Sequence, residues 1–213
     1  MYEEIRQYTD THGVTLVAVS KTRTTEQIMA LYNQGQRIFG ENRVQELLDK
    51  KDKLPSDIQW HLIGHLQKNK VKYIAPFISM IHSVDSMDLL TTISKEVGKH
   101  GRRTNVLLQF FIASEETKYG MEYEEATALL EGLKATPLPY VSLCGVMGMA
   151  SLTDNQEQVR REFRSLKQIF DKLKTRHFAS DQAFRHISMG MSGDYRIAVE
   201  EGSTMVRIGT ALF

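Results

Sequence analysis

The chain has 213 residues, of which 41% are hydrophobic and 25% are charged. This composition is typical of a soluble globular protein, and the length suffices for one or two domains. Lys and Arg total 27 against 26 Asp and Glu, which gives a net charge of +1. A nearly neutral chain has no global attraction to nucleic acid or to an anionic membrane, so we expect neither as a partner.

The sequence also predicts where the protein is found. Cys144 is its single cysteine, which excludes an intramolecular disulfide and a cysteine-based metal cluster. The first ten residues, MYEEIRQYTD, are polar and acidic, unlike a secretory signal. Apolar stretches such as 78–81 and 110–113 are far shorter than the roughly 20 residues that span a bilayer. We therefore expect a cytoplasmic protein.

Short apolar, β-branched runs alternate with segments of helical periodicity along the whole chain. After a short N-terminal helix within residues 1–12, we expect strands at 15–19, 37–40, 57–63, 79–84, 105–113, 140–147, 186–189 and 205–208. The helices between them are expected at 24–35, 44–48, 67–74, 87–99, 122–133, 155–173 and 197–201.

Eight strands that alternate with helices, without hairpin spacing, predict a parallel sheet in an α/β fold. The number eight favours a closed (β/α)8 TIM-type barrel, and we expect residues 1–213 to form one compact domain of this kind. An open α/β sheet has the same alternation and is the alternative, because counting strands does not separate the two.

In a (β/α)8 barrel the functional residues lie at the C-terminal ends of the strands. Lys21 follows the first strand, where partial burial would favour a neutral amine that attacks an aldehyde to form a Schiff base. A solvated lysine that starts a loop is the structural alternative. Asn42 follows the second strand and either binds a ligand oxygen or caps the next helix.

Residues 188–194 and 207–210 follow or end strands seven and eight, whose loops often bind phosphate in such barrels. There Ser192 and Thr210 supply hydroxyls, and Gly209 allows close approach of the backbone, although Gly and Ser are also ordinary turn residues. Arg207 lies inside an apolar strand. A charge there predicts either a ligand contact or a buried ion pair with Glu41 or Glu200.

His61 and His65 have a spacing of four, as in some helical metal sites. Gly64 interrupts any helix there, and no carboxylate stands where a helical zinc motif requires one. We therefore expect no metal site.

Seven segments occur in a characteristic order: 17–22 (VAVSKT), 39–46 (FGENRVQE), 60–71 (WHLIGHLQKNKV), 81–86 (IHSVDS), 116–120 (ETKYG), 188–192 (SMGMS) and 206–210 (VRIGT). Together they resemble the YggS/PROSC family of pyridoxal phosphate homeostasis proteins, which are similar to the N-terminal barrel domain of alanine racemase. The resemblance spans almost the whole chain.

This resemblance implies that pyridoxal 5′-phosphate (PLP) is held as a Schiff base on Lys21. It further implies phosphate contacts from Ser192, Gly209 and Thr210, an arginine, Arg207, that faces the pyridine nitrogen, and Asn42 close to the ring. The family often has Gln-Val-Asn on strand five, whereas this chain has Gln-Phe-Phe at 109–111. We therefore assign no site residue to that strand.

The resemblance implies a non-catalytic PLP carrier or buffer in vitamin B6 homeostasis, and a PLP-dependent amino-acid racemase is the alternative. Arg207 only donates, so it favours an unprotonated ring nitrogen and a weaker electron sink. A racemase also needs an acid/base on each face of its substrate: Lys21 supplies one, and Tyr119 and Tyr195 are candidates for the other. A Schiff-base aldolase is a third possibility. We expect a monomer, with PLP-dependent apoenzymes as possible partners.

Overall fold

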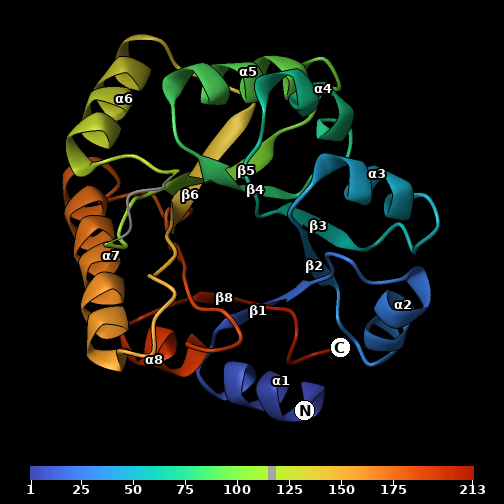
Figure 1. Cartoon of the computed structure of the whole chain (residues 1–213). Helices are drawn as coiled ribbons and strands as arrows, with labels where there is room; N and C mark the ends of the chain where they lie inside the picture. The colour runs from blue at the N-terminus through green and yellow to red at the C-terminus, as the bar shows by residue number, and fades with distance from the viewer. Residues whose placement is uncertain (115–118) are drawn as a thin grey trace.

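The computed structural model describes residues 1–114 and 119–213. Residues 116–118 of the fifth family segment lie outside this part. Eight parallel strands form a closed barrel in chain order, and Figure 1 shows helices around its outer surface. The strands are β1 (Thr15–Val19), β2 (Ile38–Glu41), β3 (Gln59–Leu62), β4 (Met80–Val84), β5 (Thr104–Gln109), β6 (Val141–Met147), β7 (His186–Ser188) and β8 (Met205–Ile208).

The helices follow the strands in regular alternation. They are α1 (Tyr2–Thr11), α2 (Thr25–Asn33), α3 (Val44–Lys51), the 3-10 turn η1 (Lys68–Lys70), α4 (Val71–Ile74), α5 (Met87–Gly98), α6 (Tyr123–Ala135), α7 (Gln156–His177) and α8 (Tyr195–Glu200). Thr24 forms a capping box with Gln27 at the start of α2, and Ser86 caps α5, because hydroxyl oxygens accept from the free amides of a first turn. No helix of the described residues is long and apolar enough to cross a membrane.

Pairing between the first and last strands closes the barrel. β1 and β8 run parallel in a register that extends from Thr15 opposite Met205 to Ala18 opposite Ile208. An open sheet would leave these two strands at opposite edges. The predicted (β/α)8 barrel is therefore confirmed, and the open-sheet alternative is wrong.

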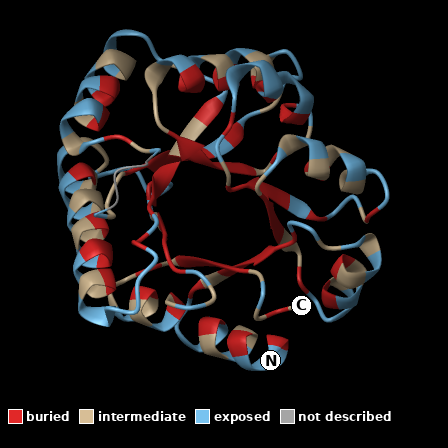
Figure 2. Ribbon diagram, viewed as in Figure 1, coloured by how far each residue is buried: buried red, intermediate tan, exposed pale blue. Residues whose placement is uncertain are grey.

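Two layers of apolar side chains lie on the two faces of the strands. Val17 and Val19 belong to a cluster that also contains Ile63, Leu107 and Met147, whereas Leu16 and Ala18 pack with the helix residues. Successive residues of a strand point to opposite faces, so the first cluster fills the barrel and the second lies between barrel and helices. Figure 2 shows the buried ring of strands and the exposed outer faces of the helices. Burial on both faces explains why these strands are almost wholly apolar.

Several elements end at other residues than the sequence predicts. β5 ends at Gln109 rather than at residue 113. The Phe110 amide donates the last hydrogen bond to β6, to the Met147 carbonyl, and Phe110 then pairs in an isolated β-bridge with Met121. α7 continues beyond residue 173 to His177, and its last turn carries cationic side chains, which suit a helix C-terminus. The single helix predicted for 67–74 is a 3-10 turn followed by one α-helical turn.

A bulge in β6 adjusts the barrel wall. Val106 of β5 lies opposite Leu143, but Leu107 lies opposite Gly145, so Cys144 is the extra residue. Gly145 has a φ of 149°, and a Cβ on it would lie 1.8 Å from the carbonyl oxygen of His186. Only glycine allows β6 and β7 to approach this closely.

A buried ion pair holds the turn that follows β1. The Glu41 carboxylate accepts hydrogen bonds from Lys50 Nζ and Ser20 Oγ, both at 2.7 Å, and Lys50 also donates to the Ser20 carbonyl at 2.8 Å. Thr22 has a φ of 60°, and its amide donates to Glu46 Oε2 at 2.9 Å. The backbone is therefore fixed on both sides of Lys21. Burial raises the pKa of the Glu41 carboxyl.

Replacing Lys50 tests how much this turn depends on the ion pair. Lys50→Met leaves the Glu41 carboxylate buried without its cation and should lower the free energy of unfolding by about 3–5 kcal/mol near neutral pH. The loss should shrink at lower pH, because protonation of Glu41, whose pKa is already raised, removes the buried charge. Chemical denaturation measures both effects.

Lys167→Met is the matched control, because Lys167 pairs with Asp171 on the exposed face of α7. Such a pair contributes less than about 1 kcal/mol. Equal losses for the two variants would show that the Glu41–Lys50 pair has no special role.

Candidate functional site

A cavity of about 480 Å³ opens at the C-terminal ends of the strands. All six residues that the sequence analysis nominates for a cofactor line it: Lys21, Asn42, Ser192, Arg207, Gly209 and Thr210. Lys21 and Asn42 follow β1 and β2, and the other four belong to β8 or to the loops after β7 and β8. The barrel thus brings together residues separated by almost 190 positions in sequence, Lys21 and Thr210 being 189 apart.

The cavity carries positive charge. Lys21, Arg23 and Arg207 line it, and no carboxylate does so among the described residues. Its polar groups also include the Ser192 and Thr210 hydroxyls. Cations and hydroxyl donors without competing acids suit an anionic ligand, and a phosphate in particular.

Lys21 is exposed to solvent within this cavity. Its position at a strand end predicts partial burial, and this prediction is wrong. Ser20 is fully buried and points its hydroxyl at Glu41, so the chain leaves the barrel wall immediately after it. The Lys21 side chain is consequently held at the mouth rather than inside the barrel.

The loops after β7 and β8 approach each other at Ser192 and Gly209. The Gly209 amide lies 3.4 Å from Ser192 Oγ, a long contact that both groups can exchange for a ligand oxygen. A Cβ on Gly209 would lie 3.3 Å from the Val19 carbonyl oxygen, whereas one on Gly193 would meet open space. The two loops therefore form a cradle of hydroxyl and amide donors above β1.

Arg207 is 4% exposed and lies in β8 with its guanidinium in the barrel. It donates to Ser188 Oγ at 2.6 Å and to the Gly148 carbonyl at 3.1 Å. The ion pair considered from the sequence is wrong, because Glu41 pairs with Lys50 and Glu200 with Arg160. Burial lowers the pKa of Arg207 to about 10, so the guanidinium stays charged at neutral pH.

A chain of buried hydrogen bonds continues from Arg207 across the barrel. Ser188 Oγ lies 3.0 Å from His82 Nδ1, and His82 Nε2 lies 3.0 Å from His61 Nδ1. Arg207 can only donate, so Ser188 Oγ accepts from it, and we assign the hydroxyl hydrogen of Ser188 to the bond with His82 Nδ1. We assign the proton of His82 to Nε2, which then donates to His61 Nδ1. In this assignment every bond of the chain is donated in the direction from Arg207 to His61.

Sequence reasoning missed His82 and Ser188. β4 has a bulge between Ile81 and Val84, a stretch that contains His82 and Ser83, and bulges often redirect side chains. Mainly because of burial, the pKa of His61 is lowered to about 3 and the pKa of His82 lies well below its usual value. Both rings are therefore neutral. The available signal was that both residues are polar and lie in strands predicted to be buried on both faces.

Three further residues at the mouth refine the predictions. Asn42 does not cap α3: the N-cap position is Arg43, without a side-chain cap bond. His65 stacks on Tyr119 at the mouth, with ring centroids 4.2 Å apart, while His61 is buried in the chain that begins at Arg207. Gln109 also lines the cavity, although no site residue was assigned to strand five.

Of the two tyrosines considered as an acid/base, Tyr119 lines the cavity and Tyr195 does not. Tyr195 is buried in α8, where its ring packs edge-on against Tyr8 at 5.6 Å. Tyr119 is 59% exposed. The geometry thus leaves Tyr119 as the tyrosine that a ligand in this cavity would meet.

The buried histidines predict how stability depends on pH. His61 has its pKa lowered from 6.5 to about 3, so below pH 6.5 the unfolded chain binds a proton that the folded chain does not. The free energy of unfolding should therefore fall as the pH drops below about 6.5, by up to about 1.4 kcal/mol per pH unit for each histidine. Denaturation curves between neutral pH and about pH 5 should show a shallower slope for His61→Gln than for the wild type. Identical slopes would contradict this.

Comparison with known proteins agrees with this geometry. Residues 2–213 match the family model "Alanine racemase, N-terminal domain". The pyridoxal phosphate homeostasis protein of Aquifex aeolicus is 42% identical over 199 residues, 93% of this chain and 85% of that protein. The structure of PipY from Synechococcus elongatus with PLP bound has a TM-score of 0.87 at 33% identity and covers 100% of this chain and 99% of that one. The form without PLP has a TM-score of 0.90 at 34% identity, with the same coverage. The chain therefore belongs to the alanine racemase N-terminal domain family and, within it, to the pyridoxal phosphate homeostasis proteins.

Proposed function

We propose that this protein binds PLP as a Schiff base on Lys21 and acts in intracellular PLP homeostasis as a non-catalytic carrier. The observation that carries the proposal is the convergence of all six nominated residues on one cationic cavity. PipY, which was solved with PLP bound, has the same fold over the whole of this chain. We further propose that residues 1–213 act as one domain and as a monomer in the cytoplasm, and that PLP-dependent apoenzymes receive the cofactor.

The donors of the cavity fit the parts of PLP. Ser192, Gly209 and Thr210 would hold the phosphate through hydroxyl and amide groups, and Asn42 would lie beside the ring. The exposed amine of Lys21 would meet the aldehyde. When bound, PLP supplies a ring that stabilises a carbanion, most strongly with its nitrogen protonated.

Arg207 supports a carrier rather than a catalyst. Its guanidinium carries hydrogens on every nitrogen and accepts none, so it favours a ring nitrogen without a proton. The bonds to Ser188 and Gly148 hold it in place. The histidine chain behind Ser188 is neutral and offers no second charge that would alter this preference.

The exposure of the cavity mouth also supports a carrier rather than a catalyst. Lys21 is exposed, so the anchor is accessible to a molecule that enters or leaves. A catalyst excludes water from its reacting atoms, which this arrangement does not do at Lys21. Tyr119 is the one observation that favours a racemase, because it lines the cavity and bears an acidic hydroxyl.

Loading with PLP tests the anchor. The wild-type protein should show a yellow absorption band that borohydride abolishes, and mass spectrometry should find the pyridoxyl adduct on the peptide that contains Lys21. Lys21→Ala should lose both signals, because Lys21 is the one lysine among the described residues that lines the cavity. Lys53→Ala, at an exposed lysine outside the cavity, should keep both. A wild type without band or adduct refutes the proposal.

Exchange of the α-hydrogen separates the carrier from the racemase. A PLP-loaded carrier incubated with L-amino acids in D2O should exchange the α-hydrogen no faster than the same concentration of free PLP. Rapid exchange that Tyr119→Phe abolishes, while PLP loading is retained, would favour the racemase instead. Nuclear magnetic resonance and chiral chromatography measure exchange and racemisation respectively.

A further inference from the structure

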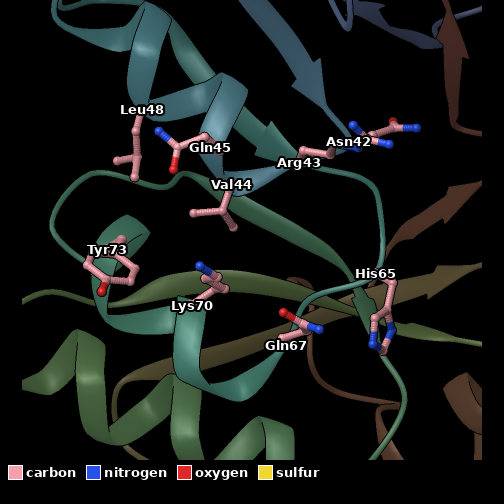
Figure 3. Close-up of a pocket in the computed structure, with 9 residues that line it drawn as sticks. All are labelled: Asn42, Arg43, Val44, Gln45, Leu48, His65, Gln67, Lys70 and Tyr73. Atoms are coloured by element: carbon pink, nitrogen blue, oxygen red, sulfur yellow. The ribbon is translucent and has the colours of Figure 1, made fainter.

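A second cavity lies between α3 and the segment formed by η1 and α4 (Figure 3). Its volume is about 500 Å³. It is lined by Asn42, Arg43, Val44, Gln45, Leu48, His65, Gln67, Lys70 and Tyr73. Asn42 and His65 also line the first cavity, so the two cavities share part of a wall at the same end of the barrel.

The second cavity is cationic. Arg43 and Lys70 line it, and neither forms an ion pair with a carboxylate within the described part of the chain. Two neighbouring lysines are different: Lys50 pairs with Glu41, and Lys68 pairs with Asp88. Glu46 interacts electrostatically with Arg43 but does not line the cavity. Two cations without a carboxylate at ion-pair distance, around a cavity that no described acidic residue lines, attract an anion.

The start of α3 adds to this charge. The helix begins at Val44, its N-cap Arg43 provides no side-chain acceptor, and Val44 and Gln45 both line the cavity. The acidic residue of that first turn, Glu46, bonds instead to Lys50 and the Thr22 amide. The amides of the first turn therefore leave a partial positive charge beside Arg43.

The other side of the cavity is apolar and aromatic. Figure 3 places Leu48 and Tyr73 at the end away from His65, with Lys70 between Tyr73 and Gln67. Tyr73 is 46% exposed, and Lys70 Nζ lies 5.8 Å from its ring centroid. An aromatic and apolar wall in a cavity with cationic side chains suits a phosphorylated aromatic molecule better than an inorganic ion.

We propose that this cavity is a second, non-covalent binding site for a small aromatic phosphate monoester, the chemical class of PLP itself. Arg43 and Lys70 bind the phosphate, and Tyr73 and Leu48 contact the ring. Asn42 and His65 separate this molecule from the one on Lys21. The identity of the ligand rests on the proposed function. The positive charge of the cavity does not depend on that function. A carrier of this form holds a second molecule next to its covalent site.

Pyridoxine 5′-phosphate is the probe, because it has the ring and phosphate of PLP but no aldehyde and cannot react with a lysine. The protein is first loaded with PLP and reduced with borohydride, which keeps the first cavity filled. Isothermal titration should then show one binding site per chain. Arg43→Ala and Lys70→Ala should each weaken binding about tenfold, the loss of one charge-assisted hydrogen bond.

Lys53→Ala is the matched control, since Lys53 is an exposed lysine that lines neither cavity. It should change the affinity less than twofold, about 0.4 kcal/mol. Arg43 and Lys70 are exposed, so both variants should fold as the wild type does, which circular dichroism checks.

Two further ligands test the class. Pyridoxine without phosphate and inorganic phosphate should each bind at least about tenfold more weakly than the probe. Inorganic phosphate that binds as tightly overturns the aromatic part of the proposal. Absence of saturable binding, or equal binding by wild type and both alanine variants, overturns the site.

Failure of the proposed function can be distinguished from failure of the second site. If the proposed function is wrong, the protein loaded with PLP shows no absorption band before the titration begins. The titration is then made on unloaded Lys21→Ala protein, where dependence on Arg43 and Lys70 supports the second site and its absence overturns it.

Discussion

The parallel pairing of β1 with β8 is the constraint on which the site depends. Val17 lies opposite Arg207 and Ala18 opposite Ile208, so the two strands end at the same level. Lys21 and Gly209 then leave the barrel side by side, although they come from opposite ends of the chain. The Glu41–Lys50 pair and the positive φ of Thr22 turn this alignment into a defined position for the lysine.

A buried guanidinium in the barrel is the second constraint, because an unpaired charge in an apolar interior is costly. Arg207 donates to two oxygen acceptors, and within residues 1–114 and 119–213 it has no carboxylate at ion-pair distance. His82, in the bulged part of β4, belongs to the same hydrogen-bonded chain. The barrel interior therefore combines an apolar cluster with a polar chain that starts at Arg207. Among the described residues no carboxylate lines the cavity above it, although Asp194 acts on Arg207 electrostatically.

Much of the fold was predictable, because buried parallel strands such as 15–19 and 205–208 are short apolar runs with clear ends. Where β5 ends was not, since the cause is a contact between Phe110 and Met121 that local periodicity does not encode. The family motifs located Lys21, Ser192 and Arg207. The exposure of Lys21, the partners of Arg207 and the chain through Ser188 to His82 depend on packing between distant strands, which sequence spacing does not show.

The direction of the hydrogen-bond chain has a consequence for how the site can change. A carboxylate at position 207 would accept hydrogen bonds and donate none. Ser188 would then have to donate to it, His82 would need its proton on Nδ1, and His61 would have to donate in turn. Every tautomer along the chain would reverse. A change at position 207 from a donor to an acceptor would therefore be accompanied by a change of tautomer in both buried histidines.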